Sequence, residues 1–369
     1  MKRSLMFMLV VTVALGVWTR VIARQEEALR ASRSRVGHLL KKAERSAIPL
    51  AAIRVDIAGT SLLYGRIQGT WRCREYHLAP ADTQAIESLF KKLAEAEGMV
   101  HTDVVAQSKT YGINTPETIR VSFCGPKVLE DPGGDVLFAF DIGKAIPGRD
   151  GAFVRRRGTK EIWGIDSNPR IELTQAVAPG LPPMLEKGCL PKSWSGWSKE
   201  PNQIFVDHAA SGYELHKRAV DIDPAAMRAG EVPWTWIMNP GPTEFETASG
   251  PSHAYSYFLQ QVPYVAVLPR EERERSGVDS PVARVTVAAH EGDPLEVHIG
   301  KSLGDGTSTI WVPLTQTLYL VQDEIAQLLA PEASLFASGS DQNPWDEYLR
   351  KASGTEPHLA PGLDPSSPR

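Results

Sequence analysis

Residues 111–116 read Tyr-Gly-Ile-Asn-Thr-Pro, and residues 276–281 read Ser-Gly-Val-Asp-Ser-Pro. The two stretches are offset by 165 positions, and the same offset separates Trp71 from Trp236. Glycine allows a positive φ, Asn or Asp bonds the local backbone, and proline fixes the entry to the next strand, so both stretches predict a turn. Because the turn recurs at a constant distance from a tryptophan, the sequence indicates two tandem copies of one folding unit.

Further matches extend the repeat in both directions. Arg-Val-Ser-Phe at 120–123 corresponds to Arg-Val-Thr-Val at 284–287, and Ile-Gly-Lys at 142–144 corresponds to the same tripeptide at 299–301. A turn that the fold requires should appear in both copies, whereas a catalytic signature need not. The repeated motifs therefore point to structure, and we expect Trp71 and Trp236 to occupy matching elements.

Composition limits the class of protein. The chain has 369 residues, which is enough for two domains, with 42% hydrophobic residues, 23% charged residues and a formal net charge of -4. This composition is globular and is not basic enough to favour nucleic acid as a partner. Cys73, Cys124 and Cys189 are far apart, which excludes a zinc ribbon and a disulfide-dense scaffold. Burial of Cys73 and Cys124 in strands is favoured over a disulfide between them.

The amino terminus predicts a membrane segment. Residues 5–18 are uninterruptedly apolar or small, and we expect residues 1–23 to be an uncleaved signal anchor. A signal peptide cleaved after 14–16 or 21–23 is the alternative. The anchor predicts a single-pass protein of the cytoplasmic (inner) membrane whose bulk is extracytoplasmic, although the arginines after the segment weaken the argument for orientation.

The remaining chain predicts an α+β fold, with two tandem copies of a mainly antiparallel sheet plus helix unit behind the membrane helix. Expected strands outnumber helices and mostly follow one another directly, which disfavours a doubly wound parallel sheet. The helix expected after Asp82 has apolar residues spaced for one buried face. The predicted segments after the anchor are a juxtamembrane helix at 24–48, a first repeat domain at 49–175, a linker at 176–203, a second repeat domain at 204–330 and a disordered tail at 331–369.

These residues carry a family resemblance. A strand hairpin, Trp71, a helix start at Pro-Ala-Asp (80–82), the turn at 111–116 and an Ile-Gly at the end of a strand resemble the domain-of-unknown-function 4340 family, well over 53–175 and more weakly over 204–330. The resemblance implies a bacterial protein with one amino-terminal membrane segment, of the kind often encoded beside ABC-type transporter components. No reaction or catalytic residue is assigned to the family, so none is carried over.

No motif predicts catalysis, a metal or a cofactor. Gly300-Lys301-Ser302 resembles the end of a phosphate-binding loop, but the first glycine that this loop requires is replaced by Leu295. The histidines of the second copy lack metal-ligand spacing. A Ser-His-Asp site built from distant positions stays open, although there is no Gly-x-Ser-x-Gly elbow.

Arg155, Arg156 and Arg157 are the candidate site residues. They lie near the expected turn of the closing hairpin of the first copy, where the second copy has Val-Pro-Leu at 312–314. A solvated turn is one interpretation. The other is contact with an acidic protein partner or an anionic lipid headgroup, and we predict these arginines as the partner-binding residues.

The functional expectation is a membrane-anchored, periplasmic, non-catalytic accessory subunit of a transport or cell-envelope complex, of the type associated with ABC transporters. Its expected partners are the cytoplasmic membrane, bound through the amino-terminal helix, and other proteins such as transporter subunits. Two alternatives are an envelope protein that binds a ligand or polymer in a groove between the copies, and an envelope hydrolase.

Overall fold

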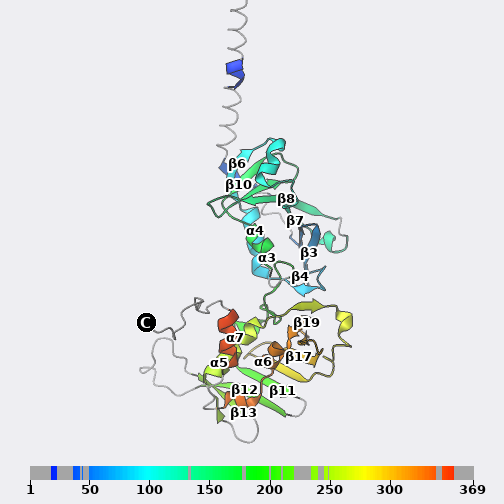
Figure 1. Ribbon diagram of the computed structural model, residues 1–369, viewed down its shortest axis with the longest axis vertical. Coiled ribbons are helices and arrows are strands. Elements are labelled where there is room, and N and C mark those ends of the chain that lie inside the picture. The colour runs from blue at the N-terminus through cyan, green and yellow to red at the C-terminus, as the bar shows by residue number, and fades with distance from the viewer. Residues whose placement is uncertain are drawn as a thin grey trace, which may run out of the picture. The chain divides into compact units, whose positions relative to one another are not determined.

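A computed structural model describes residues 18–22, 36–41, 44, 50–131, 134–176, 180–198, 201–208, 211–219, 234–239, 245–247, 249–337 and 343–352. The chain divides into two compact units, Met1–Leu185 and Glu186–Arg369. Each unit has its own sheet, in which neighbouring strands are antiparallel, together with a few helices (Figure 1). The mainly antiparallel α+β architecture expected from the sequence is therefore present in both units.

The first unit contains a ten-stranded sheet in the order β1-β6-β10-β9-β8-β7-β2-β3-β4-β5. Its strands are β1 (Val36–His38), β2 (Ala52–Ile57), β3 (Thr60–Ile67), β4 (Thr70–Cys73), β5 (Ala79–Pro80), β6 (Glu97–Thr102), β7 (Ile119–Cys124), β8 (Val136–Ala145), β9 (Ala152–Arg156) and β10 (Ile162–Ile165). Its helices are α3 (Thr83–Ala94) and α4 (Arg170–Thr174), with short 3₁₀ helices η1 (Val105–Tyr111) and η2 (Pro126–Leu129).

Helix α3 begins where the sequence predicts it. The Asp82 carboxylate accepts hydrogen bonds from the backbone N–H groups of Gln84 and Ala85, which satisfies two donors that an α-helix start leaves free. Ile86, Leu89 and Leu93 are buried on one face, as their spacing predicts. Phe90 of this helix packs edge to face on Phe123 of β7 at 5.1 Å, so α3 lies against the first sheet.

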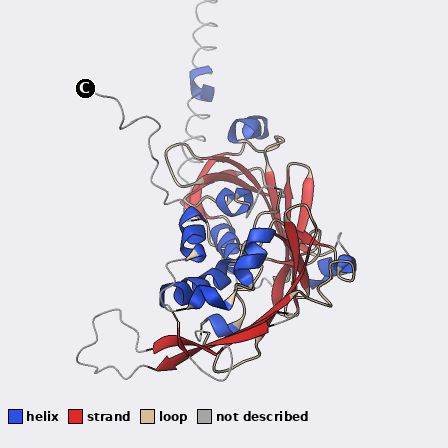
Figure 2. Ribbon diagram, turned by 60° about the horizontal axis from the view of Figure 1, so that its bottom comes forward, coloured by secondary structure: helices blue, strands red, loops and turns tan. Residues whose placement is uncertain are grey.

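The second unit contains a nine-stranded sheet in the order β14-β13-β12-β11-β16-β17-β18-β19-β15. Its strands are β11 (Gln203–His208), β12 (Ser211–Ala219), β13 (Trp234–Asn239), β14 (Phe245–Glu246), β15 (Ala266–Leu268), β16 (Ala283–Ala288), β17 (Leu295–Ser302), β18 (Thr307–Val312) and β19 (Thr317–Gln322). Its helices are α5 (Ser249–Phe258), α6 (Asp323–Leu329) and α7 (Pro344–Ala352), with short 3₁₀ helices η3 (Ser195–Trp197), η4 (Leu259–Gln261), η5 (Arg270–Glu272) and η6 (Ala333–Phe336). The three α-helices lie together on one side of the strands (Figures 1 and 2).

The two sheets have the same strand order apart from β1. From one edge, the first reads β6-β10-β9-β8-β7-β2-β3-β4-β5 and the second reads β15-β19-β18-β17-β16-β11-β12-β13-β14. Each strand of the second sheet thus has a counterpart at the same place in chain order and in the sheet. Trp71 in β4 and Trp236 in β13 are both buried and hold corresponding places.

The repeated turn has the same backbone geometry in both units. Gly112 has φ 72° and Gly277 has φ 75°, a region that residues with a Cβ rarely adopt. The neighbouring strand supplies a second glycine in each unit: a Cβ on Gly143 would collide with the Tyr111 carbonyl oxygen, and one on Gly300 with the Ser276 carbonyl oxygen. The Ile-Gly-Lys tripeptides are therefore strand residues that admit a close backbone, which agrees with the rejection of a phosphate-binding loop.

Residues 36–38 correct the prediction of a continuous juxtamembrane helix at 24–48. They form β1, which pairs with β6 through Val36 opposite Met99 and His38 opposite Glu97. Backbone hydrogen bonds to the free edge of β6 stabilise residues 36–38 in an extended conformation. These bonds outweigh the helical propensity of the charged segment. Most of 24–48 lies outside the described residues.

The prediction of a disordered tail at 331–369 is wrong for the described residues 331–337 and 343–352. The Trp345 indole is buried, donates a hydrogen bond of 3.1 Å to the Leu328 carbonyl oxygen and stacks on Phe336 at 5.2 Å between ring centroids. Burial of two large aromatic rings offsets the entropy that is lost when the segment becomes ordered. Residues 353–369 lie outside the described part of the chain.

Part of the predicted linker packs on the second unit, and Cys73 and Cys124 are buried in strands as the sequence predicts. Trp194 and Trp197 contact each other edge to face at 4.9 Å, and the Trp194 indole donates to the Asp293 carbonyl oxygen, so this stretch packs onto the second unit. Cys73 and Cys124 are buried free thiols. Burial raises the pKa of Cys73 to about 12, so this thiol is unreactive at neutral pH.

No helix among the described residues is long and apolar enough to cross a bilayer. Residues 1–17 and 23 of the predicted anchor lie outside the described residues.

Substitution of Gly112 by alanine should destabilise the first unit by about 1–3 kcal/mol more than substitution of Gly59 by alanine. Both glycines have positive φ, but a Cβ at Gly59 meets nothing within 4 Å, whereas one at Gly112 lies 2.6 Å from Lys144 Cγ and 2.9 Å from the Lys144 backbone nitrogen. Urea unfolding of the two purified full-length variants measures the difference. Equal losses of stability would show that the turn does not depend on the close approach of β8.

Candidate interaction sites

The three arginines predicted from the sequence lie on two different parts of a hairpin. Arg155 and Arg156 are the last residues of β9, and Arg157 is the first residue of the turn that leads to β10. The first two side chains are half-buried, whereas Arg157 is exposed. The three residues therefore do not form one exposed cluster at the hairpin tip.

Arg155 belongs to an ion-pair network inside the first sheet. Its Nη2 atom donates to Asp141 Oδ2 at 2.6 Å and to Asn114 Oδ1 at 2.7 Å, and Arg120 Nε donates to Asp141 Oδ1 at 3.2 Å. Asp141 on β8 stands directly opposite Arg120 on β7 and Arg155 on β9, and it is 2% exposed. The network neutralises a buried carboxylate and ties the turn at 111–116 to the sheet.

The second unit ties its turn with a different arginine. Arg273, which follows η5, donates to Asp279 of the turn at 2.5 Å, and its guanidinium lies 4.5 Å from the centre of the Trp311 ring. Trp311 on β18 stands opposite His298 on β17, the strand that corresponds to β8. Both units thus fix the Asn or Asp of the turn with an arginine. The sequence did not reveal this role for Arg155 because the tethering residue comes from a different element in each unit.

Arg156 is also engaged within the first unit. Its guanidinium donates to both carboxylate oxygens of Glu44, at 3.0 and 3.2 Å, and lies 5.1 Å from the centre of the Phe138 ring. The hydrogen bond from Arg156 is the main cause that lowers the pKa of the Glu44 carboxyl. Arg157 is left as the exposed residue of the three, and its role in partner binding stays a prediction.

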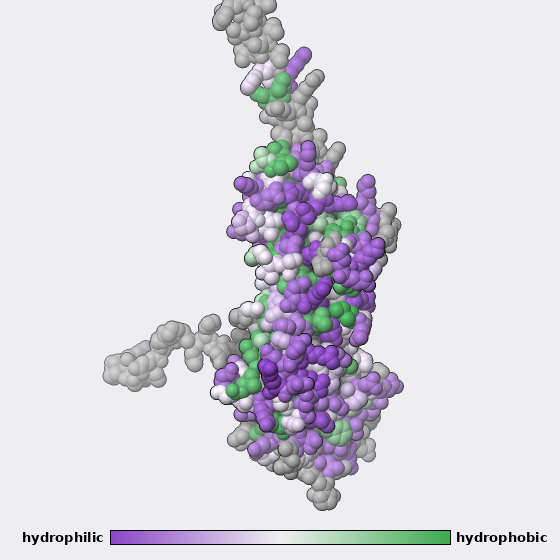
Figure 3. Space-filling model, turned by 90° about the vertical axis from the view of Figure 1, so that its right-hand side faces the viewer, coloured by the Kyte–Doolittle hydropathy of each residue, from purple (hydrophilic) through white to green (hydrophobic). Residues whose placement is uncertain are grey.

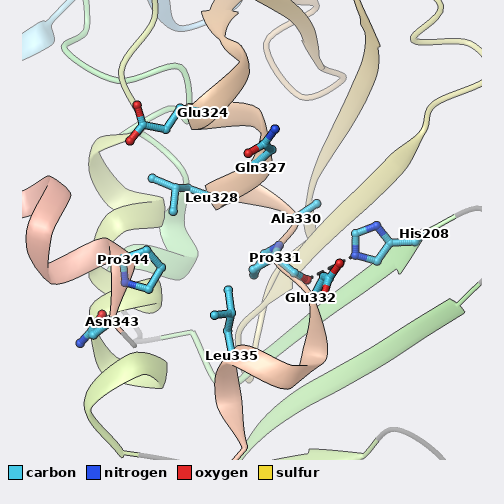
Figure 4. Close-up of a pocket in the computed structure, with 10 residues that line it drawn as sticks. All are labelled: His208, Glu324, Gln327, Leu328, Ala330, Pro331, Glu332, Leu335, Asn343 and Pro344. Carbon is cyan, nitrogen blue, oxygen red and sulfur yellow. Dashed lines mark hydrogen bonds between the residues drawn. The ribbon is translucent and has the colours of Figure 1, made fainter. Parts of the chain in front are cut away.

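The second unit contains an open groove that the sequence did not predict, with a volume of about 1020 Å³ (Figure 4). Four elements build it: the end of β11, the outer face of α6, η6 with the residues before it, and the start of α7. The described lining residues are His208, Glu324, Gln327, Leu328, Ala330, Pro331, Glu332, Leu335, Asn343 and Pro344. We call this cavity the α6–α7 groove.

The α6–α7 groove combines apolar walls with acidic edges. Leu328 and Pro331 are buried and Leu335 is half-buried, whereas the carboxylates of Glu324 and Glu332 are exposed. In Figure 4 Leu328 and Pro331 lie between Glu324 and Glu332, with Leu335 below them. No lysine or arginine occurs among the described residues that line it. The groove therefore offers an apolar surface with negative charge on two sides.

A smaller cavity of about 320 Å³ adjoins the groove and shares His208, Gln327 and Ala330 with it. Its polar group is Asp323, which accepts hydrogen bonds from Ser302 at 2.9 Å and from Ser308 at 2.5 Å. A catalytic triad places histidine between serine and aspartate, but both hydroxyls donate directly to Asp323, and His208 bonds the Pro331 carbonyl oxygen at 3.3 Å. This geometry does not build a serine nucleophile.

The remaining histidines of the second unit do not converge. His298 contacts Glu296 at 3.3 Å and His216 contacts Glu214 at 3.8 Å, each with a carboxylate two positions away on its own strand. Within the described ranges, no group of three or more His, Cys, Asp or Glu side chains could hold a metal ion. Figure 3 shows one face of the surface as mostly hydrophilic, with separate small apolar patches.

Sequence reasoning missed the α6–α7 groove because one wall lies in the range assigned to a disordered tail. The composition of 331–352 is rich in Ser, Pro and Asp, which conceals its large aromatic residues. The available signal was the set of three large aromatic residues in this range, Phe336, Trp345 and Tyr348. Tyr348, like the other two, packs on the second unit, with its ring edge to face on Phe258 at 5.4 Å.

Substitution of Asp141 by asparagine should destabilise the protein by about 3 kcal/mol, because it leaves two arginines without their shared counter-ion. Substitution of Glu44 by glutamine is the matched control. Its ion pair with Arg156 is about 30% exposed on both sides and should contribute about 1 kcal/mol or less. Urea unfolding of both full-length variants gives the two losses, and a loss at Asp141 no larger than that at Glu44 would contradict a tethering role for the network.

Comparison with known proteins identifies one family. The family model described as a domain of unknown function (DUF4340) matches residues 71–178. No curated protein and no solved structure matches the chain. The matched range runs from Trp71 past the end of α4, and it contains the turn, the two glycines of the close approach and the Arg155 network. The first unit of this chain therefore contains a domain of the DUF4340 family, as its sequence resemblance indicates.

Proposed function

We propose that this chain is a non-catalytic interaction protein made of two tandem copies of one unit, anchored in the inner membrane and serving as an accessory subunit of a transport or cell-envelope complex. The observation that carries the proposal is the common strand order of the two sheets, combined with different side chains at their surfaces. A repeated scaffold whose fold-determining residues recur and whose surfaces diverge is suited to presenting two different contact sites.

The internal repeat is supported by more than strand order. The positive φ of Gly112 and Gly277 and the close approach of Gly143 and Gly300 recur in corresponding elements. Glycines required at two corresponding places in each of two sheets are hard to explain if the sheets are unrelated. Duplication of one DUF4340-like unit, followed by divergence of the second copy, accounts for a family match that is limited to the first.

The surfaces that differ between the copies are the places where we expect partners. The first copy carries the exposed Arg157 directly after β9, whereas Pro313 stands at the corresponding place after β18 in the second. The second copy carries the α6–α7 groove, one wall of which comes from the segment after the repeat. We expect at least one of these surfaces to contact another subunit.

An envelope protein that binds a polymer is the second candidate. Carbohydrate polymers are commonly held by exposed aromatic rings, but the described lining of the α6–α7 groove has leucine, proline and glutamate instead. This chemistry favours a protein segment over a polymer. The hydrolase alternative loses support from the direct Ser302–Asp323 and Ser308–Asp323 hydrogen bonds.

The accessory role predicts stable protein partners. An affinity-tagged full-length chain, purified from detergent-solubilised membranes of its host, should recover membrane-complex subunits in near-equal amounts, measured by quantitative mass spectrometry. Substitution of Arg157 by serine should reduce this recovery more than substitution of Arg149 by serine, since both arginines are exposed in the first unit but only Arg157 lies beside β10. Recovery of no protein above the level of an untagged strain would rule out the accessory role.

Membrane anchoring predicts that residues 5–23 stay attached to the mature protein. Their continuous apolar character makes transfer into lipid favourable, so the chain should sediment with membranes and resist extraction by high salt. Amino-terminal sequencing and fractionation test this. A mature chain that begins between Val17 and Gln25 and stays in the soluble fraction would establish cleavage instead.

A further inference from the structure

The α6–α7 groove has the shape and chemistry of a site for a protein segment. Its walls come from elements that side-chain packing fixes firmly: Leu328 is 8% exposed on α6, Trp345 at the start of α7 is fully buried, and Phe336 at the end of η6 is fully buried. A groove of about 1020 Å³ between such elements is larger than one side chain needs. It can accept several residues of another chain.

The charge of the groove selects the class of segment. Glu324 lies on α6 and Glu332 precedes η6, so the two carboxylates stand on different elements with the apolar residues between them (Figure 4). Asp323 adds a third carboxylate in the adjoining cavity. An apolar side chain next to lysine or arginine complements this arrangement, whereas an acidic segment would be repelled.

The same face of the second unit already binds one helix of this chain. α7 packs on α5, with the Trp345 ring 5.1 Å from Tyr255 and the Tyr348 ring 5.4 Å from Phe258. The Trp345 indole donates to the carbonyl oxygen of Leu328, a residue that also lines the groove. This surface is therefore suited to contact with peptide elements through apolar anchors and backbone hydrogen bonds.

We propose that the α6–α7 groove binds a segment of a partner protein in which an apolar residue is flanked by basic residues. The apolar residue would contact Leu328, Pro331 and Leu335, and the basic residues would pair with Glu324 and Glu332. The inference rests on the proposed role as an interaction subunit and names the chemistry of the partner.

The test uses the purified full-length chain and three short fluorescein-labelled peptides. One has a single leucine between two lysines, the second replaces both lysines by glutamate, and the third replaces the leucine by serine. Fluorescence anisotropy should show the lysine–leucine peptide binding at least about fivefold more tightly than either of the others, with affinity that falls as salt is raised.

Substitution of both Glu324 and Glu332 by glutamine should weaken this peptide about fivefold or more. The matched control replaces Glu271 and Glu274, two exposed glutamates near η5, by glutamine. It changes the net charge equally and should leave the affinity unchanged. Substitution of Glu324 and Glu332 by lysine should reverse the preference, so that the glutamate peptide binds best. Circular dichroism of each variant checks that the fold is retained.

Several results would overturn the proposal. If the Glu324→Gln, Glu332→Gln variant and the Glu271→Gln, Glu274→Gln control weaken binding equally, only net charge matters. If the leucine peptide binds no more tightly than the serine peptide, the apolar wall is not used. Competition by spermidine as strong as by unlabelled peptide would identify a site for small organic cations instead. If subunits still co-purify with the Glu324→Gln, Glu332→Gln chain at the unchanged level, the groove fails while the accessory role stands. If no subunit co-purifies with the parent chain, the accessory role itself fails.

Discussion

The close approach of one backbone to another governs the architecture of both units. In each, the carbonyl oxygen before the turn glycine lies against a glycine of the neighbouring strand, Gly143 on β8 or Gly300 on β17. A side chain at either strand position would push the turn away from the sheet. The turn glycine needs its positive φ only while the turn lies against the strand. The strand that leaves each turn, β7 or β16, is a central strand of its sheet, so this contact positions the turn beside the middle of the sheet.

Divergence between the units is visible in how this turn is held. The first unit uses the buried Asp141 with Arg120 and Arg155, and the second uses Arg273 against Trp311. A buried carboxylate is costly unless its charge is compensated, so the three residues of the first network can change only together. His298 and Trp311 stand at the places in the second sheet that Asp141 and Arg155 hold in the first, and an arginine from outside the sheet supplies the tether there.

Local pattern was enough to predict much of the fold. The glycine-containing stretches at 111–116 and 276–281 predicted the two turns, and Asp82 with the apolar spacing after it predicted the start of α3. Contacts between residues that are far apart in the sequence could not be predicted from local pattern. Arg155 sits in a run of three arginines, and only the register of β8 and β9 shows that it faces Asp141 rather than solvent. For the same reason, β1 was hidden in a charged segment whose conformation depends on the free edge of β6.

The α6–α7 groove illustrates why function was the least predictable property of this sequence. Each of its acidic residues, taken alone, resembles an ordinary surface glutamate. Its walls combine β11 and α6 with residues that follow the predicted second repeat domain. A surface that is present in one unit alone has no matching motif in the other unit that could mark it in the sequence. The segment that completes the groove is held by Trp345 and Phe336, two aromatic residues that bury their rings without extending the sheet. A short segment anchored in this way forms one wall of a groove while it leaves the strand order of the sheet unchanged, so the surface of one unit can differ from that of the other without a change of fold.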